Sequence, residues 1–370
     1  MSKMKFCALA AFTAVISSFA CSAGEIADGV YTITVNGGET REMTSAEASE
    51  LIAAYNAGTV TEFRKCGEGT LVSTSLANYK GRIVIAEGVY MAQSGASSFG
   101  DSNGETEIND GASVFINGYM ELWFEHLIVS GKGFDDKGVI RAVGGHAYLS
   151  YLTMKSDCLI AAETGRYLNF NQAGNKPFNM NGYTLTIDPS NQNTAFHGGN
   201  IVNAGHIVNL RKRLSIYADT ALSHGPSASI ELGGTDSSSD ISIAACAAEN
   251  NWTLRYSNPN SQYGLAFHSD ASWHGPIVLD IGQGTAVINN NDESTKKSKV
   301  YLYGNLSGEG NFDFKDREVY FYGTNTITGE LRGSGFVTLA NAKSVGDYSK
   351  FKITNPVWYC HSEGDRKSVV

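Results

Sequence analysis

The fold is decided by the stretch from Gly131 to Ile187, which reads GKGFDDKGVIRAVGGHAYLSYLTMKSDCLIAAETGRYLNFNQAGNKPFNMNGYTLTI. Short apolar runs, such as Val139 to Val143 and Tyr183 to Ile187, alternate with breaks such as Gly144-Gly145 and Asn181-Gly182. Short strands at this close spacing, bounded by Gly, Asn and Asp, are typical of an all-β protein. The stretch therefore predicts consecutive turns of a β-coil rather than a compact catalytic domain.

Two segments outside this stretch, Lys65 to Met91 and Gly304 to Asp347, show a similar order of strand, polar turn and glycine-bounded strand. Together the three pieces cover about a third of the chain. They resemble passenger segments of the autotransporter-associated β-strand repeat family, which occurs in large exported proteins of Gram-negative bacteria. The resemblance implies a right-handed parallel β-helix displayed outside the cell, and it carries over no catalytic residues.

An antiparallel β-sandwich is the alternative fold. Four dipeptides are strong signals for two-residue hairpins, because both residues tolerate the positive φ of a type I′ turn: Asn103-Gly104, Asp110-Gly111, Asn117-Gly118 and Asn181-Gly182. The same residues also suit the left-handed positions at the corners of a β-solenoid. The family resemblance favours the solenoid.

The first 23 residues have the layout of a secretory signal peptide. A basic start, Met1 to Lys5, precedes an apolar run from Phe6 to Ala20 and small residues at Cys21-Ser22-Ala23. This run is shorter than the roughly twenty residues that a membrane-spanning helix needs. We expect cleavage after Ala23 and export to the cell surface, the outer membrane or the medium. A lipoprotein attached at Cys21 is the alternative, although the usual Leu three residues earlier is missing.

Composition agrees with an exported β-protein. The formal charge is −9 with only 18% charged residues, so the chain lacks the basic footprint of nucleic-acid-binding proteins. Its 41 glycines against 6 prolines suit a turn-rich β-protein with a packed core. The cysteines outside the predicted signal peptide lack the paired spacing of a zinc site: Cys66, Cys158, Cys246 and Cys360. We expect isolated, mostly buried thiols, although an oxidising compartment permits a disulfide.

One helix is predicted, over residues 44–57, after an alternating strand from Gly29 to Val35. It begins with a capping box at Thr44-Ser45-Ala46-Glu47, and Gly58 is placed to end it. Its apolar stripe consists of Leu51, Ile52 and Tyr55. Because the first coil of a solenoid exposes an apolar end, we expect this helix to cover it. A stray surface helix is the alternative interpretation.

From Thr59 to about Val345 the pattern stays β-like, and solenoid coils take roughly twenty to twenty-five residues each. The predicted organisation is a signal peptide (1–23), an N-terminal strand and capping helix (24–58), a β-helix (59–347) and an irregular tail (348–370). Four segments rich in Ser, Gly, Asn or Pro are expected to form outer loops: Ala92 to Gly104, Pro189 to Asn200, Gly233 to Asp240 and Tyr256 to Gln262.

The sequence predicts no catalytic, cofactor-binding or metal-ligating residue. The eight histidines show no paired ligand spacing: His126, His146, His197, His206, His224, His268, His274 and His361. Gly144-Gly145-His146 and His197-Gly198-Gly199 resemble only loosely the Gly-His-Gly of pectin-cleaving β-helix enzymes. Asp135-Asp136 near Arg141 fits a lyase-type calcium site, but a solvated acidic turn explains the same residues.

Aromatic residues supply the remaining candidate site. Two groups would stack on sugar rings if they faced outward: Tyr119, Trp123 and Phe124, and Tyr320, Phe321 and Tyr322. Strand alternation places Tyr320 and Tyr322 on the face opposite Phe321. One of these two faces is therefore expected to fill the core.

These patterns predict an exported, surface-displayed or secreted non-enzymatic β-helix that acts as a structural stalk or adhesin through its outer loops. The expected partners are surface glycans, host or matrix proteins, or other copies of the chain. Nucleic acid is not expected as a partner, and no integral membrane span is expected in the mature chain. A polysaccharide lyase or glycoside hydrolase on the same fold is the main alternative, and it requires several acids with an Arg or Lys along one β-face. A carbohydrate-binding module is the second alternative.

Overall fold

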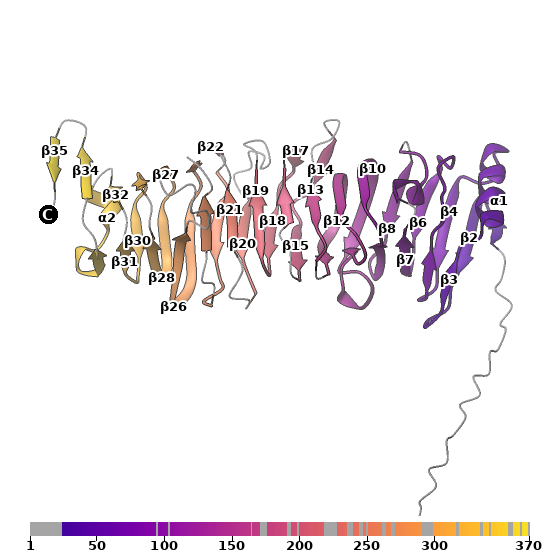
Figure 1. Ribbon diagram of the computed structural model, residues 1–370, viewed down its shortest axis with the longest axis horizontal. Coiled ribbons are helices and arrows are strands. Elements are labelled where there is room, and N and C mark those ends of the chain that lie inside the picture. Colours follow the sequence, from indigo (N-terminus) through magenta and orange to yellow (C-terminus); the bar gives the residue numbers. More distant parts are fainter. Residues whose placement is uncertain are drawn as a thin grey trace, which may run out of the picture.

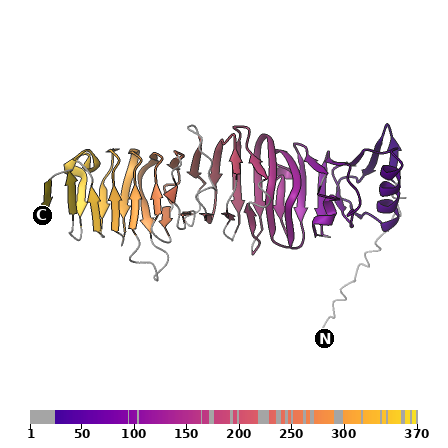
Figure 2. The same ribbon diagram turned by 90° about the horizontal axis from the view of Figure 1, so that it is seen from above.

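The computed structural model is a long parallel β-solenoid with a helix near its N-terminal end (Figure 1, Figure 2). This architecture confirms the parallel solenoid over the antiparallel sandwich. The described residues are 24–370 except 94, 103, 164, 171–175, 191–193, 198–199, 218–227, 235–239, 244–246, 249–250, 261–263, 268–270, 290–298, 316–317, 334–335, 340–341, 354–357, 363–364 and 369–370.

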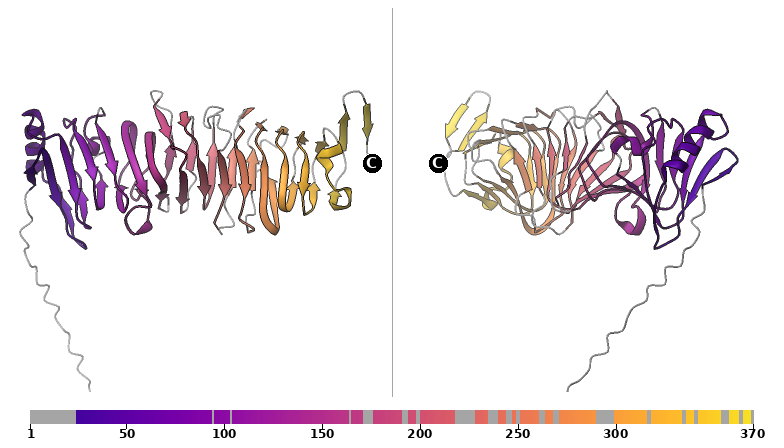
Figure 3. Two further views of the ribbon diagram at one scale, coloured as in Figure 1. Left: turned by 180° about the vertical axis from the view of Figure 1, so that it is seen from behind. Right: turned by 45° about the vertical axis from the view of Figure 1, so that its right-hand side comes forward.

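The strands build three long faces, because successive strands of a coil turn a corner and the next coil repeats them (Figure 3). The first face begins with β2 (Val30–Thr34), β4 (Glu62–Cys66), β6 (Arg82–Ile85), β8 (Glu105–Ile108), parts of β10 (Met120–Gly131) and β12 (Ala147–Ala162), β14 (Pro177–Asn179) and β17 (Asn200–Val202). Further along the chain, the strands at the same position in each coil as the first face are β22 (Ala247–Ala248), β25 (Ala271–Trp273), β27 (Lys299–Leu302), β29 (Glu318–Phe321), β32 (Phe336–Leu339) and β34 (Trp358–Ser362).

The second and third faces run beside the first along the solenoid. The second face consists of β3 (Thr40–Glu42), β5 (Thr70–Val72), β7 (Gly88–Ala92), β9 (Ala112–Ile116), β11 (Ile140–Ala142), part of β12, β15 (Thr184–Pro189), β18 (His206–Asn209), β20 (Ser229–Leu232), β23 (Thr253–Tyr256), parts of β26 (Ile277–Asn289) and β28 (Leu306–Phe314), and β30 (Asn325–Ile327). The third face consists of parts of β10, β12, β26 and β28 with β13 (Leu168–Phe170), β16 (Thr194–Phe196), β19 (Arg213–Ile216), β21 (Asp240–Ile243), β24 (Gly264–Phe267), β31 (Leu331–Gly333) and β33 (Phe351–Ile353).

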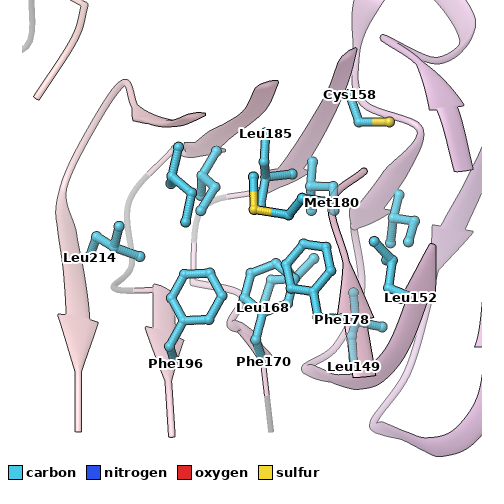
Figure 4. Close-up of a cluster of buried hydrophobic side chains, with 14 of the residues drawn as sticks. Leu149, Leu152, Cys158, Leu168, Phe170, Phe178, Met180, Leu185, Phe196 and Leu214 are labelled. Carbon is cyan, nitrogen blue, oxygen red and sulfur yellow. The ribbon is translucent and has the colours of Figure 1, made fainter. Parts of the chain in front are cut away.

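The core is a continuous spine of inward side chains, because alternate residues of every strand point into the coil. On the second face, five apolar residues share one register position in consecutive coils and are 0–1% exposed: Leu185, Ile207, Ile230, Leu254 and Ile277. Phenylalanines stack in the same way inside the middle of the solenoid (Figure 4). There Phe170 lies 5.4 Å from Phe178 and 4.6 Å from Phe196, measured between ring centroids.

The N-terminal end is covered by α1 (Ser45–Asn56), as the sequence predicts (Figure 1). The capping box is confirmed, since the Thr44 hydroxyl accepts from the Glu47 N–H and the Glu47 carboxylate accepts from the Thr44 N–H. Leu51 is fully buried and Tyr55 packs on Tyr79 of a later coil, with ring centroids 5.2 Å apart. The helix therefore closes the apolar spine.

Three of the four dipeptides that suggested hairpins lie at corners instead, while Asn103 of the fourth lies outside the described residues. Asn181 and Gly182 both have positive φ, 49° and 77°, between β14 and β15. Those two strands do not pair with each other; each pairs in parallel with β12. Asp110-Gly111 and Asn117-Gly118 likewise separate strands on different faces. The left-handed backbone that Asn and Gly permit is used to turn a corner, so the hairpin interpretation is wrong at these described positions.

Among the described pairings, two are antiparallel and both lie at chain ends. They join β1 (Glu25–Ala27) to β2 and β34 to β35 (Asp365–Ser368). Because β2 and β3 pair with β4 and β5, the solenoid already begins within residues 24–58. At the other end it continues past residue 347 through β33 and β34, after the short helix α2 (Ala342–Val345).

Two segments expected to be outer loops contribute to the coil. Residues Thr194–Phe196 form β16 and are buried, and the short 3-10 helix Gly95–Phe99 buries Phe99. Cys158 is a buried free thiol and Cys66 a half-buried one, in agreement with the prediction, while Cys246 and the Cys360 side chain lie outside the described residues. The described part of the chain contains no helix with the length and apolar character that crossing a bilayer requires.

Candidate functional site

Aromatic side chains form rows along the outside of the solenoid. Phe321 is buried and Tyr322 is 41% exposed, so the predicted alternation on β29 is confirmed, with Phe321 in the core. We use the name tyrosine ladder for the outward rings that continue this row over three coils: His274, Tyr301, Tyr303, Tyr320 and Tyr322.

Rings of the tyrosine ladder stack on each other from coil to coil. The Tyr303 ring lies 4.3 Å from the His274 ring and 4.7 Å from the Tyr322 ring, with interplanar angles of 25° and 10°. Both faces of Tyr303 are therefore covered. Sugar stacking needs a free ring face, so Tyr303 offers a partner its edge and hydroxyl rather than a stacking platform.

The neighbouring column of the ladder adds polar groups. Tyr301 and Tyr320 stack with centroids 5.0 Å apart, and the Tyr320 hydroxyl donates to Glu318. This hydrogen bond, helped by partial burial and by the charge of Glu318, raises the pKa of Tyr320 to about 12. Lys299 lies 5.7 Å from the Tyr320 ring centroid. The ladder thus presents neutral phenol, carboxylate and ammonium groups side by side.

Four histidines repeat this contact, each packing on a tyrosine of the following coil. The pairs are His126 with Tyr151 (3.9 Å), His146 with Tyr167 (4.5 Å), His197 with Tyr217 (4.8 Å) and His274 with Tyr303 (4.3 Å). These contacts give the four histidines a packing role between coils, which the sequence analysis did not predict. His224 and His268 and the side chain of His361 lie outside the described residues.

The Gly144-Gly145-His146 motif is explained by the same packing. A Cβ on Gly145 would lie 1.8 Å from the carbonyl oxygen of Gly118 in the preceding coil. Glycine is required at this corner because the two backbones touch. His146 Nδ1 accepts a hydrogen bond from the Tyr167 N–H at 3.0 Å. The motif therefore builds a corner of the coil.

Some side chains of the predicted aromatic group on β10 point outward. Tyr119 and Phe124 are 59% and 48% exposed, and Trp123 is half-buried. Tyr119 contacts Tyr148 at 5.7 Å with a tilt of 58°, so this contact does not cover a whole ring face. Among the residues predicted from the sequence, Tyr119 and Phe124 keep the geometry that sugar stacking needs.

A row of charged side chains runs along the outside of the first face. We call it the charged row, and it consists of Glu62, Arg64, Arg82, Glu105, Glu107 and Lys155. Arg82 lies at its centre, 3.4 Å from Glu62, 3.3 Å from Glu105 and in contact with Glu107. This row partly matches the arrangement that the enzyme alternative requires, with acids and bases along one β-face.

The acids of the charged row are engaged in ion pairs. Burial alone would raise the pKa of Glu107, but hydrogen bonds from Lys155 and Arg82 hold it below its usual value. A general acid in glycoside hydrolysis needs a carboxyl with a raised pKa. Glu107 stays ionised at neutral pH, so its geometry favours linking of neighbouring coils over acid catalysis.

Among the carboxyl groups of the described residues, that of Glu125 has a strongly raised pKa, and its side chain lies inside the coil. Its surface is 4% exposed, and it accepts a 2.8 Å hydrogen bond from the buried Thr106 hydroxyl. Burial, together with a smaller effect of the Asp101 charge, raises the pKa of Glu125 to about 8 and outweighs that hydrogen bond. Glu125 is therefore protonated at neutral pH, and its burial separates it from the charged row.

Glu125 makes the stability of the protein depend on pH. Between the ordinary value of 4.5 and the folded value of about 8, the folded state holds a proton that the unfolded state releases. The stabilising contribution is present below pH 4.5 and is lost as the pH rises through 8. Glu125→Gln should match the parent at pH 5 and be more stable by roughly 2 to 4 kcal/mol at pH 9.

Urea unfolding followed by tryptophan fluorescence measures this difference. Glu121→Gln, on the exposed side of the same strand, serves as the control and should leave the pH dependence unchanged. Equal pH dependence in Glu125→Gln and the parent would contradict the assignment.

The structure gives Arg141 partners other than the predicted acidic pair, and its Nη1 donates to the Lys137 carbonyl oxygen at 3.3 Å. Asp135 and Asp136 form a left-handed turn with φ of 53° and 54°, and Asp135 pairs with Lys137 at 3.0 Å. The Arg141 guanidinium contacts Glu163, at 3.0 Å, on the second face. In the described residues, no group of three or more His, Cys, Asp and Glu side chains is arranged to hold a metal ion. The contacts fit a solvated turn.

Comparison with known proteins gives no relative, since no protein-family model, curated protein or solved structure matches this chain. Its function must therefore be argued from its own surfaces.

Proposed function

We propose that this protein is an exported, passenger-like β-helix that acts as a structural stalk or adhesin at the cell surface. The observation that carries the proposal is the linking of successive coils on the outside as well as the inside. The apolar spine joins successive coils inside the solenoid. The tyrosine ladder and the charged row join them on its outer surface. A rod whose coils are linked both in the core and on the outer surface is suited to holding a binding surface away from the cell.

The described outer surface supplies contacts for a partner. Tyr119 and Phe124 offer ring surface to a glycan, and tyrosine edges of the ladder offer hydroxyl groups and apolar area to a glycan or a protein. Tyrosine is enriched in protein interfaces for this combination of properties. Surface glycans, matrix proteins and further copies of the chain are thus the partner classes.

Export is tested by expressing the whole chain in a Gram-negative host and sequencing the N-terminus of the recovered protein. The first 23 residues have the signal-peptide pattern, so we expect the mature chain to begin at Gly24 and to be found outside the cytoplasm. Full-length protein that stays in the cytoplasm with Met1 or Ser2 intact would contradict this proposal.

The adhesin function is tested with the mature chain against a panel of soluble polysaccharides and matrix proteins. Affinity electrophoresis measures binding, and a reducing-end assay together with absorbance of unsaturated sugars measures cleavage. We expect binding to at least one member without cleavage, and Tyr119→Ala with Phe124→Ala should weaken glycan binding about tenfold. Time-dependent cleavage would instead support the lyase or hydrolase alternative. Tyr183→Ala, at another exposed tyrosine, is the matched control.

A further inference from the structure

Three side chains outside these surfaces have the connectivity of a nucleophile, a base and an acid. They lie on the outer side of the second face, where Ser229 and Glu231 belong to β20 and His206 to the neighbouring β18. His206 lies opposite Ser229 in register. Ser229 and Glu231 are two residues apart and so point to the same side, while Ile230 between them is fully buried.

The imidazole of His206 bridges the other two side chains. Its Nδ1 lies 2.5 Å from the Ser229 hydroxyl oxygen and its Nε2 lies 2.9 Å from a Glu231 carboxylate oxygen. A carboxylate only accepts hydrogen bonds, so the single N–H of a neutral imidazole belongs on Nε2. Nδ1 is then left to accept the Ser229 O–H. This direction of donation is the one that activates a serine nucleophile.

Neighbouring groups hold the carboxylate in its charged form. The Ser257 hydroxyl donates to the second oxygen of Glu231, and Arg255 lies opposite Glu231 on β23. The hydrogen bond from His206, then that from Ser257 and the charge of Arg255, outweigh burial and lower the pKa of Glu231. Thr253 lies opposite Ser229 on the same strand as Arg255. Glu231 therefore remains an acceptor that orients His206.

We propose that Ser229, His206 and Glu231 form an acyl-transfer site that hydrolyses small esters, such as acetyl groups on sugar hydroxyls. Ser229 Oγ bonds to the ester carbonyl carbon as its proton passes to His206 Nδ1. The ester C–O bond breaks and the departing alcohol takes that proton. Water then attacks the carbonyl carbon of the acyl-serine by the same steps, which releases the carboxylic acid and restores Ser229. This activity is additional to the rod function and independent of it.

The position of the three residues sets the substrate class. Ser229 is 9% exposed and lies on the outer side of the second face, so its hydroxyl would admit only a small acyl group approaching from outside. Backbone N–H groups of the parallel strands are engaged in the sheet, as in the bond from Ser229 N–H to Gly205 O. Arg255, which lies opposite Glu231 on β23, would supply positive charge for the developing oxyanion. Esters, which need less stabilisation than amides, are the expected substrates.

The test combines an active-site probe with a model ester. The mature chain is treated with a fluorophosphonate and digested for peptide mass spectrometry, and p-nitrophenyl acetate hydrolysis is followed separately. We expect labelling of Ser229 at least tenfold above Ser307, an outer-face serine whose register partners are Val278 and Thr326. Ser229→Ala should lower ester hydrolysis at least tenfold, and His206→Gln should abolish labelling.

Two results would overturn the assignment. One is labelling of Ser229 no higher than that of Ser307, and the other is ester hydrolysis unchanged in Ser229→Ala, which would be background from exposed imidazoles. Urea unfolding of Ser229→Ala checks that the fold persists. If His206→Gln does not fold, Glu231→Gln replaces it, and a reduced rate of Ser229 labelling is expected there.

Discussion

Replacing Phe170 by alanine is expected to lower the free energy of unfolding by about 3 to 5 kcal/mol. Phe170 is 4% exposed and stacks against both Phe178 and Phe196 inside the solenoid, where the three rings form one cluster (Figure 4). Its removal leaves a cavity beside the rings of Phe178 and Phe196, whose centroids lie 6.4 Å apart. In a solenoid each coil is supported by its neighbours, so the loss weakens the contact between two parts of the rod.

Urea unfolding and limited proteolysis measure this effect. Phe124→Ala is the matched control, because the same atoms are removed from a side chain that is 48% exposed; its cost should stay below about 1 kcal/mol. Phe170→Leu should fall between the two. Equal losses for Phe170→Ala and Phe124→Ala would mean that Phe170 is not part of the core.

Replacing Lys65 by methionine is expected to destabilise the N-terminal coils by about 3 to 5 kcal/mol. The Lys65 ammonium is fully buried and donates to three carbonyl oxygens, those of Gly67, Gly69 at 2.6 Å and Glu87 at 2.7 Å. Burial lowers the pKa of Lys65 to about 8, so the group is still mainly protonated at pH 7. Methionine fills similar volume but leaves all three carbonyls without this donor.

Arg64→Met is the control for this prediction. Arg64 precedes Lys65 on β4, is 43% exposed and pairs with Glu62 on the surface at 2.5 Å. Exposed ion pairs contribute little, so its loss should cost less than about 1 kcal/mol. Amide hydrogen exchange locates the effect, and Lys65→Met should raise exchange at the corner from Cys66 to Thr70 while leaving β26 and β28 protected. Unchanged exchange at that corner would contradict the role of Lys65.

The fold could be predicted because its rules are local. Glycine-bounded short strands, the capping box at Thr44 and Glu47, and the alternation around Phe321 each follow from the chemistry of neighbouring residues. The hairpin signal at Asn181-Gly182 was ambiguous for the same reason. Positive φ is a local property, whereas the choice between a corner and a hairpin depends on strands that are distant in the sequence.

The aromatic groups on β10 and β29 could be named from the sequence, but the contacts between coils could not be predicted, because they join residues one coil apart. His274 and Tyr303, or His206 and Ser229, come together only when coils of unequal length are aligned. A single inserted residue changes which side chains meet. Lys65 illustrates a further limit, since a lysine on an alternating strand is expected outside, yet here three corner carbonyls hold it inside.

The most direct test of the account is a disulfide trap across two coils, because every surface described above depends on outward residues of consecutive coils forming aligned rows. Tyr303→Cys with Tyr322→Cys places two Cα atoms about 5 Å apart, within the reach of a disulfide. The pair Tyr303→Cys with Tyr320→Cys is offset by two residues, about 8 Å, and is out of reach. Under oxidation, mass spectrometry should find the first cross-link and not the second. The offset cross-link, or the absence of the aligned one, would contradict the parallel register on which the rod, its ladder and its proposed ester site all depend.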